Sequence, residues 1–248
     1  SSRPATVSSQ MTCDPLSLTQ DALRTPEQPP ILPQRYHKTL AHVVPKALPT
    51  DVAGAIGEWM TKQRRWLIPV SENDEVHEQA ANFGWWHQQI DDLAPEFASA
   101  VRACVQQHRE VAQAACCVSE FDLSHIEIYT MLHHHGAVEP WHDDVILSSL
   151  EGLPVDVLET RRISFELTLV VEPAMFEGGH REFSDGKAIA AVHNQLVFWH
   201  PAQVHRIRPV ECWNSAALHG RWSVRGYVHG PAPDGWKDKM LALRLQQS

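Results

Sequence analysis

The chain has 248 residues, 43 % of them hydrophobic, and a formal net charge of −9, which suits one soluble domain with one sizeable core. The acidic balance argues against a nucleic-acid partner, because proteins that bind a phosphate backbone cluster Lys and Arg. No apolar run approaches the roughly 18 to 20 residues that a membrane helix needs, so we expect no membrane association.

The cysteines and the N-terminal sequence indicate in which cellular compartment the protein is expected. Five Cys are an odd number, and none of them form a CxxC pair, which predicts reduced and mostly buried thiols rather than a disulfide framework. The N-terminus has no basic segment followed by an apolar one, so no signal peptide is expected. Together these features predict a cytoplasmic protein.

The first third of the chain predicts an arm followed by helices. Residues 1–33 are rich in Ser, Thr, Gln and Pro, and we expect a flexible arm there, with a single domain over residues 34–248. A short strand is predicted at 42–48. Helices are predicted from Thr50 to about Arg65 and from Pro95 to about Ala115, with mostly loop at 71–88 between them.

Strand patterns dominate the rest of the chain. Strands are predicted at 124–132, 161–171, 188–199, 204–210 and 222–228. Turn residues at 176–179 and 184–186 flank a short strand through Phe183, and a closing helix is expected at 236–247. Helices that precede a run of strands predict a mainly β jelly roll of two sheets, with the helices as buttresses on an outer face.

The segment Trp141-His142-Asp143-Asp144 carries the candidate metal ligands. In an extended strand His142 and Asp144 point the same way, whereas Asp143 points away. With His205 as a third ligand, two imidazoles and a carboxylate would hold one side of a metal and leave the other side open, which suits non-haem Fe(II) oxygen chemistry. The chain has 16 His, so this pattern alone does not decide the site.

Further motifs occur in an order that resembles the Fe(II)- and 2-oxoglutarate-dependent dioxygenases, in particular the prolyl-4-hydroxylase-like group. The resemblance runs from Tyr129 to Gly230, within an expected metal and cosubstrate core at residues 124–230. The matching segments are, in chain order, Tyr129, the His142 and Asp144 pair, Arg162 to Leu167, Phe176 to Phe183, Val197 to His205, and Arg221-Trp222-Ser223.

The resemblance implies a double-stranded β-helix, with Fe(II), 2-oxoglutarate and O2 at the site and ascorbate as an accessory reductant. Arg221 would hold the distal carboxylate of 2-oxoglutarate through two parallel hydrogen bonds, and Ser223 would add a hydroxyl from the same strand face. Arg221 follows His205 at a greater distance than the family pattern, which predicts an enlarged hairpin at 211–220. Arg225 shares the face and is a rival for the carboxylate.

Tyr129 is the implied hydroxyl donor to 2-oxoglutarate, and the alternative is a half-buried strand Tyr with its hydroxyl in water. The candidate substrate contacts are Trp141, Glu166, His134 and Arg225. Glu166 would hold a substrate ammonium if the apolar face of 161–171 meets the helices, and the alternative is an outward, solvated face. Trp141 is predicted either as a pocket wall, together with Trp199, or as core.

The resemblance implies an oxygenase rather than a halogenase, because Asp144 stands where related halogenases have a small residue. The preferred function is hydroxylation of an unactivated C–H bond in an amino acid or natural-product small molecule, with release of succinate and CO2. Desaturation or cyclisation stays open. The alternatives are a prolyl-type hydroxylase that acts on a protein and a non-catalytic, cupin-like metal-binding barrel.

Overall fold

The computed structural model describes residues 41–62, 68–69, 82–85, 87–116, 118, 122–144, 160–170, 176–213 and 220–230. The helices are α1 (Thr50–Lys62), α2 (His87–Leu93), α3 (Pro95–Gln107) and α4 (Arg109–Cys116). The strands are β1 (Ala41–Pro45), β2 (Ile68–Pro69), β3 (Asn82–Trp85), β4 (Asp122–His133), β5 (Glu139–His142), β6 (Arg161–Thr168), β7 (Phe176–Gly178), β8 (Arg181–Phe183), β9 (Ala188–Ile189), β10 (Gln195–Trp199), β11 (His205–Ile207), β12 (Val210–Cys212) and β13 (Arg221–His229).

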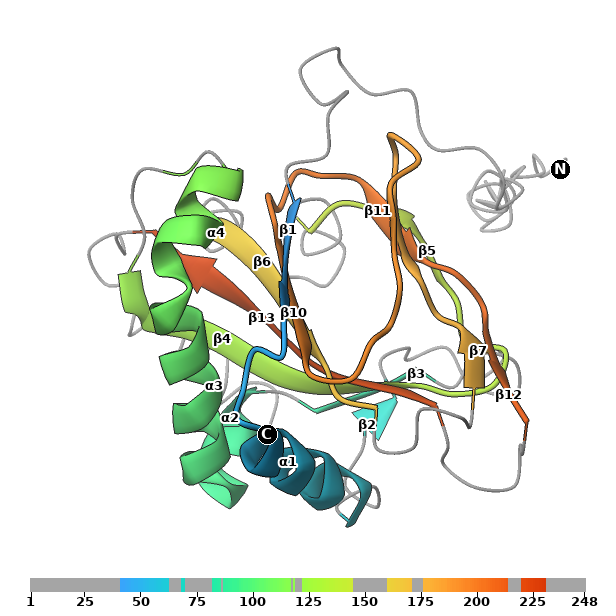
Figure 1. Ribbon diagram of the computed structural model, residues 1–248, viewed down its shortest axis with the longest axis horizontal. Coiled ribbons are helices and arrows are strands. Elements are labelled where there is room, and N and C mark those ends of the chain that lie inside the picture. The colour runs from blue at the N-terminus through green and yellow to red at the C-terminus, as the bar shows by residue number, and fades with distance from the viewer. Residues whose placement is uncertain are drawn as a thin grey trace, which may run out of the picture.

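The strands form two facing sheets and a short ribbon (Figure 1). The larger sheet has the order β1-β10-β6-β13-β4-β3-β2, the smaller one has the order β5-β11-β8-β9, and β12 pairs with β7. The strand pairs are antiparallel. The expected fold, a mainly β jelly roll with helical buttresses, is confirmed.

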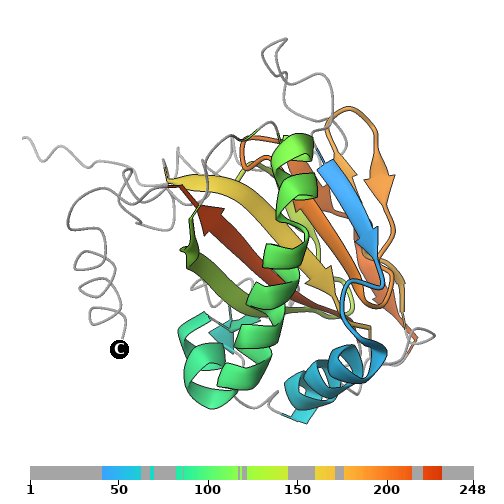
Figure 2. The same ribbon diagram turned by 60° about the vertical axis from the view of Figure 1, so that its left-hand side comes forward.

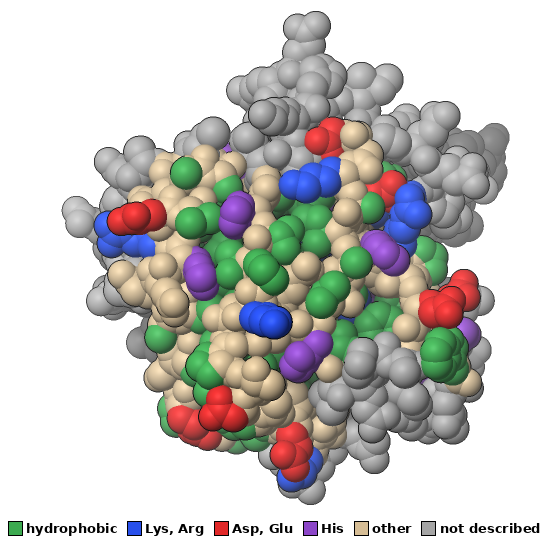
Figure 3. Space-filling model, viewed as in Figure 1, with side chains coloured by type: hydrophobic (Ala, Val, Ile, Leu, Met, Phe, Trp, Pro, Cys, Tyr) green, Lys and Arg blue, Asp and Glu red, His purple; other side chains and the backbone are tan. Residues whose placement is uncertain are grey.

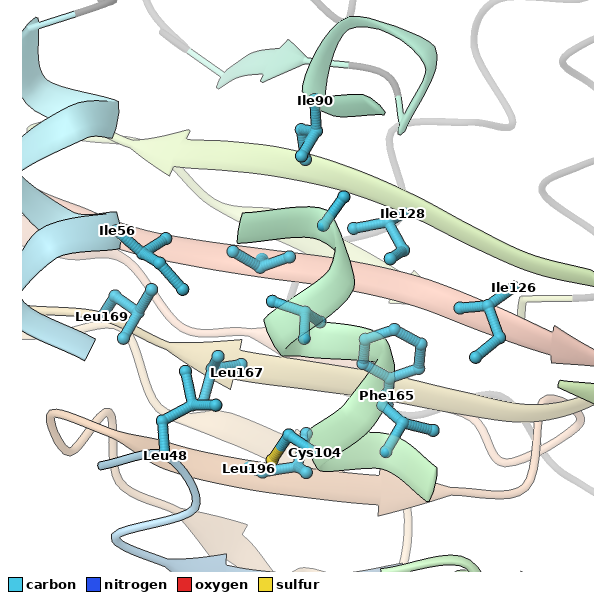
Figure 4. Packing of buried hydrophobic residues seen from close by; sticks show 14 of the residues in the cluster. Leu48, Ile56, Ile90, Cys104, Ile126, Ile128, Phe165, Leu167, Leu169 and Leu196 are labelled. Atoms are coloured by element: carbon cyan, nitrogen blue, oxygen red, sulfur yellow. The ribbon is translucent and has the colours of Figure 1, made fainter. Parts of the chain in front are cut away.

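The helices cover the outer face of the larger sheet, as Figure 2 shows for α3 and α4. Alternation along the strands sends one set of side chains to the helices, because neighbouring strand residues point to opposite faces. Phe165 and Leu167 of β6 are buried there beside Cys104 of α3 (Figure 4). The predicted apolar face of residues 161–171 therefore packs on the helices.

The other face of β6 and its neighbours points between the two sheets and is strongly polar. Glu166 of β6 is buried at 1 % exposure, and Arg221 and Arg225 of β13 are buried beside it. The alternative in which Glu166 faces solvent is therefore wrong. Burying several charged side chains costs free energy unless they are paired with opposite charges. The interior between the sheets is therefore the place to look for a functional site.

Several predicted elements are divided in the structure. The helix expected from Pro95 is two helices, which meet at His108, where φ is −99° and ψ is 15°. The strand expected at 188–199 is divided into β9 and β10 by a turn at Asn194, whose φ is 58°. The strand expected at 204–210 ends at Ile207, and a new strand begins at Val210.

Other predictions lie partly or wholly outside the described residues. These are the arm at 1–33, the closing helix at 236–247 and residues 214–219 of the expected hairpin. The segment predicted as turn at 176–179 contains β7, and the last residue of this strand, Gly178, and the following Gly179 both have positive φ. Cys104, Cys116 and Cys212 are buried thiols that form no disulfide, as predicted.

Two observations concern surfaces. Among the described residues, no helix is both long enough and apolar enough to cross a membrane. On the face shown in Figure 3, the described Lys and Arg side chains lie apart from one another, with hydrophobic and His side chains between them.

Candidate metal and cosubstrate site

The three predicted metal ligands lie together at the edge of the smaller sheet. His142 ends β5 and is paired with His205, the first residue of β11, while Asp144 follows β5 by two residues. One potential ligand atom from each residue lies within 4.8 Å of the others. The backbone N–H of Asp144 donates to the Pro201 carbonyl at 2.9 Å, which fixes the carboxylate beyond the end of the strand.

Both imidazoles are oriented by the backbone. The Nδ1 atom of His142 is 2.7 Å from the Pro140 carbonyl, and that of His205 is 2.7 Å from the Gln203 carbonyl. A carbonyl only accepts, so each Nδ1 carries the proton and each Nε2 offers a lone pair, the arrangement usual for metal-binding His. Burial, together with nearby His142, lowers the pKa of His205 to about 3, so its imidazole is neutral.

Asp144 is a buried carboxylate with two hydrogen-bond donors. Trp199 donates its indole N–H to Oδ2 at 2.8 Å, and the Tyr227 hydroxyl donates to Oδ1 at 3.2 Å. Burial alone would raise the pKa of Asp144, but the adjacent His205 and His142 hold it below its usual range. Two imidazoles that each present an Nε2 lone pair and one ionised carboxylate with an oriented outer shell fit a divalent iron.

An irregularity in β5 turns a second acidic residue toward the interior. His205 pairs with His142 but Ile207 pairs with Glu139, so the register shifts and β5 carries one extra residue. Such a bulge puts Glu139 and His142, three positions apart, on the same face. There Glu139 accepts a hydrogen bond from Arg225 at 2.7 Å.

Three arginines surround Glu166 in the same interior. Arg221 donates to Oε1 of Glu166, Arg181 of β8 donates to Oε2, and Nε of Arg225 is 3.2 Å from Oε2. Burial opposes ionisation of Glu166, but the guanidinium groups of Arg181, Arg221 and Arg225 hold its pKa well below the usual range. The site thus combines a metal-ligand set with a strongly cationic wall.

Several donors in this wall have no protein partner. Among the described residues, Nε and Nη1 of both Arg181 and Arg221 are buried without a hydrogen-bond partner, and so is the Ser223 hydroxyl. Unpaired buried donors are rare in proteins and cost free energy unless a ligand or water satisfies them. These atoms fit the distal carboxylate of 2-oxoglutarate, which needs several converging donors.

The two-glycine turn before β8 makes room for Arg221. A Cβ built on Gly179, whose φ is +63°, would lie 2.8 Å from Cδ of Arg221 and 3.2 Å from Cγ2 of Val210. The backbone N–H of Gly179 donates to the Pro209 carbonyl at 3.0 Å. The Gly178-Gly179 motif therefore shapes the cavity wall behind the arginine side chain.

The structure locates the other candidates in different surroundings. The Tyr129 hydroxyl is 3.4 Å from that of Tyr227, so it joins the network on Asp144. Trp141 packs under the guanidinium of Arg206, 4.6 Å from the ring centre. Because Trp141 and Arg206 each adjoin an inward-facing ligand on their strands, this contact lies on the outer face, which disagrees with the predicted pocket wall.

Two further substrate candidates differ in outcome. Glu166 already faces three guanidinium groups, so a substrate ammonium would meet strong repulsion there, and the predicted role fits poorly. His134 is half-buried after β4, in a turn where its carbonyl accepts the Ala137 N–H at 3.0 Å. A substrate contact by His134 remains a prediction.

Sequence reasoning missed Arg181, Glu139 and Tyr227. Tyr227 could have been predicted, because it continues the alternation of Arg221, Ser223 and Arg225 on β13. Glu139 was hidden by the bulge, and Arg181 reaches Glu166 only because β8 lies opposite β6 in the other sheet. No local pattern marks either residue.

No family model matches the chain, and no curated protein sequence matches it. Solved structures do share its fold. A prolyl-4-hydroxylase from Pseudomonas putida is similar with a TM-score of 0.56 and 20 % identity, over 79 % of this chain and 95 % of that one. A prolyl hydroxylase from Trichoplax adhaerens, in complex with a peptide fragment of hypoxia inducible factor, has a TM-score of 0.55 and 12 % identity, over 84 % and 89 % of the two chains.

A third similar structure comes from secondary metabolism. The non-haem α-ketoglutarate-dependent carbocyclase SnoK from nogalamycin biosynthesis has a TM-score of 0.53 and 11 % identity, over 84 % of this chain and 90 % of that one. The chain therefore has the fold shared by prolyl-4-hydroxylases and this carbocyclase, as the sequence motifs implied.

Proposed function

We propose that the protein is an Fe(II)- and 2-oxoglutarate-dependent oxygenase that hydroxylates a C–H bond of an amino acid or natural-product small molecule. The observation that carries this proposal is the pairing of two sites in one barrel. Three ligand atoms within 4.8 Å of one another share the interior with a cationic wall that retains buried, unpaired donors. A purely structural core has no need of either feature.

Each residue has a defined role in this proposal. His142, Asp144 and His205 hold Fe(II), while Trp199 and Tyr227 orient the Asp144 carboxylate. Bound Fe(II), 2-oxoglutarate and O2 supply the oxidant, with release of succinate and CO2, and ascorbate serves as accessory reductant.

The inner wall of the barrel holds the cosubstrate. Arg221 and Ser223 donate to the distal carboxylate of 2-oxoglutarate, and Tyr129 lies close enough to the Asp144 network to donate a hydroxyl near the metal. Arg225 is bound by Glu139 and lies beside Glu166, so fewer of its donors are available than those of Arg221. This favours Arg221 over Arg225 as the carboxylate ligand.

A small molecule is the favoured substrate class because the chain is acidic and the sequence segments 133–135 and 211–220 carry His and Trp residues. The similarity to a carbocyclase from nogalamycin biosynthesis agrees with this choice. A peptidyl hydroxylase is the second candidate, since one similar structure holds a peptide. The buried thiols Cys104, Cys116 and Cys212, which form no disulfide, support a reducing, cytoplasmic location.

The reaction class is tested by anaerobic titration of the Fe(II)-loaded protein with 2-oxoglutarate. Chelation should produce a metal-to-ligand charge-transfer band, and Asp144→Ala should remove both the band and 2-oxoglutarate turnover. A folded protein that binds iron but gives no band would leave the cupin-like barrel as the better explanation. Succinate release in the presence of free amino acids, compared with Pro-containing peptides, then separates the two substrate classes.

A further inference from the structure

The carboxylate of Glu166 occupies the position at which guanidinium groups from both sheets meet. Arg221 comes from β13 of the larger sheet and Arg181 from β8 of the smaller one, and each donates to a different oxygen of Glu166. Arg221 is also the residue expected to hold the cosubstrate. Its guanidinium is therefore already engaged by a carboxylate that belongs to the protein itself.

The charges in this cluster do not cancel. Arg181, Arg221 and Arg225 contribute three positive charges, and Glu166 and Glu139 contribute two negative ones, which leaves a net charge of +1. A buried cluster that served only stability would be expected to balance its charges and satisfy its donors. The nearby buried carboxylate of Asp144 is a metal ligand in the proposed function, so one further carboxylate would complete the balance of this cluster.

The unpaired donors belong to the same two arginines. Arg181 and Arg221 each use Nη2 for Glu166, while Nε and Nη1 of both are buried without a partner among the described residues. Each guanidinium therefore has further N–H groups that can donate to a ligand. A second carboxylate, which accepts several hydrogen bonds, matches the unused donors of the two arginines.

The cluster is also connected to the metal ligands. The Arg181 guanidinium stacks over the Trp199 ring, 4.1 Å from its centre, and the indole N–H of Trp199 donates to Asp144 at 2.8 Å. One side chain thus contacts both the cationic wall and a metal ligand. A carboxylate bound by Arg181 and Arg221 would therefore lie in the same interior as the metal ligands, where a cosubstrate would be chelated.

We infer that Glu166 is an internal competitor for the carboxylate site, and that Arg181 is the second cation of that site. This inference rests on the proposed function and deepens it. In the absence of cosubstrate, Glu166 stabilises three guanidinium groups that would otherwise repel one another. When a dicarboxylate binds, its distal carboxylate shares Arg181 and Arg221 with Glu166, and the repulsion between the two carboxylates weakens binding.

The inference predicts opposite effects for two variants of one ion pair. Glu166→Gln keeps the shape of the side chain but removes the competing charge, so it should bind a dicarboxylate at least about tenfold more tightly than the wild type. Arg181→Gln removes one of the two cations and should bind it about tenfold more weakly. A role limited to folding would weaken binding in both variants or leave it unchanged.

The first probe is glutarate, a dicarboxylate without a keto group, titrated calorimetrically into the metal-free 248-residue protein. The matched control is Glu182→Gln. Glu182 is the neighbour of Arg181 on β8, but it pairs with Arg206 and Arg208 instead. This control removes the same charge from another arginine pair, and its glutarate affinity should stay within about twofold of the wild type.

Glu166→Gln leaves a larger uncompensated charge, so its folding must be checked by circular dichroism and thermal unfolding. If this variant does not fold, the double variant Arg181→Gln with Glu166→Gln restores the net charge to that of the wild-type cluster. The inference then predicts tighter glutarate binding by the double variant than by Arg181→Gln alone. Equal or weaker binding would overturn it.

A second probe separates this inference from the proposed function. The charge-transfer titration with Fe(II) and 2-oxoglutarate is repeated with Glu166→Gln, which should reach half-saturation at a lower 2-oxoglutarate concentration. Suppose that the wild type and Glu166→Gln both give a band, with the same half-saturating 2-oxoglutarate concentration and the same glutarate affinity. This result would rule out the competitor role of Glu166 but not the oxygenase function. If neither protein gives a band but glutarate still binds Glu166→Gln more tightly, the oxygenase proposal fails and the carboxylate site remains.

Discussion

His142 and His205 lie directly opposite each other on two antiparallel strands, with ring centres 4.3 Å apart. Each ring donates its Nδ1 hydrogen to the carbonyl of the residue two positions before it, Pro140 in one case and Gln203 in the other. Both Nε2 atoms are thus presented by local backbone contacts. The ligand set is organised by the strands themselves, so single substitutions should affect the metal with little effect on the fold.

Replacing His205 by Ala should reduce metal affinity by more than about 100-fold, because it removes a ligand rather than one of its outer partners. Titration with Mn(II), followed by electron paramagnetic resonance, measures the loss without needing turnover. His42→Ala, at an exposed position on β1, is the matched control and should bind Mn(II) as the wild type does. Unchanged Mn(II) binding by His205→Ala would place the metal elsewhere.

Trp199→Phe tests the support of the carboxylate ligand. The substitution keeps an aromatic ring but removes the N–H that donates to Asp144 at 2.8 Å. Loss of such a contact typically lowers metal affinity about 10- to 100-fold, and we expect a value in that range from the same titration. Trp222→Phe is the control, since Trp222 is buried on the helix-facing side. Equal affinities in the two variants would contradict the supporting role.

The features that the sequence predicted well are those with a period of two. The apolar alternation of Phe165 and Leu167 defined one face of β6, and of the two alternatives left open the structure has this face on the helices. The same alternation on β13 brought Arg221 and Arg225 to one face, and both lie beside Glu166. The face on which a strand side chain lies follows from the strand's own sequence, so it can be inferred without knowing which strands are its neighbours.

The features that escaped prediction depend on contacts between distant segments. Glu139 enters the interior because a bulge breaks the alternation of β5, and bulges leave no clear mark in the sequence. Arg181 reaches Glu166 across the gap between two sheets. The predicted role of Glu166 as a cation ligand fits poorly for the same reason, since its three partners come from two other strands.

Gly179→Ala should impair both the fold and the cosubstrate site. Its φ of +63° is unfavourable for Ala, and the added methyl would lie 2.8 Å from the Arg221 side chain. We expect a loss of about 1 to 3 kcal/mol in the free energy of unfolding and weaker glutarate binding. Gly54→Ala in α1 has open space around the new Cβ and should be stabilising by about 0.5 to 1 kcal/mol. Urea unfolding measures both, and equal stabilities would refute the packing argument.

Glu182 should contribute to the loss of folding stability at low pH. Its hydrogen bond from Arg208, together with Arg206, lowers the pKa of Glu182 from 4.5 to about 2. A carboxyl with a depressed pKa in the folded state contributes stability above its unfolded pKa, and this contribution is lost as the pH falls from 4.5 toward 2. The unfolding free energy of Glu182→Gln should therefore fall less steeply over this window, as measured by urea unfolding at several pH values.

Glu58→Gln is the control for that pH series, because the ion pair of Glu58 with Lys62 is fully exposed on α1 and such pairs contribute little. Its pH profile should follow that of the wild type. A Glu182→Gln profile that also superimposes on the wild type would show that the arginine pair does not couple to folding.

Asn194 joins the segment between β1 and α1 to the turn before β10. Its side chain accepts the Leu48 N–H at 2.9 Å and donates to the Leu48 carbonyl at 2.7 Å, while its own backbone stands at a φ of 58°. Asn194→Ala removes both hydrogen bonds and adds strain, since Ala tolerates this φ less well than Asn. We expect the free energy of unfolding to fall by about 2 to 4 kcal/mol.

Asn194→Gly separates the two contributions to that loss. Gly adopts a positive φ without strain, so this variant should lose only the side-chain hydrogen bonds and be more stable than Asn194→Ala, despite the greater backbone entropy that Gly loses on folding. Urea unfolding of the three proteins gives both differences. If Asn194→Ala costs less than about 1 kcal/mol, the two Leu48 groups have found other partners and the tether does not stabilise the segment after β1.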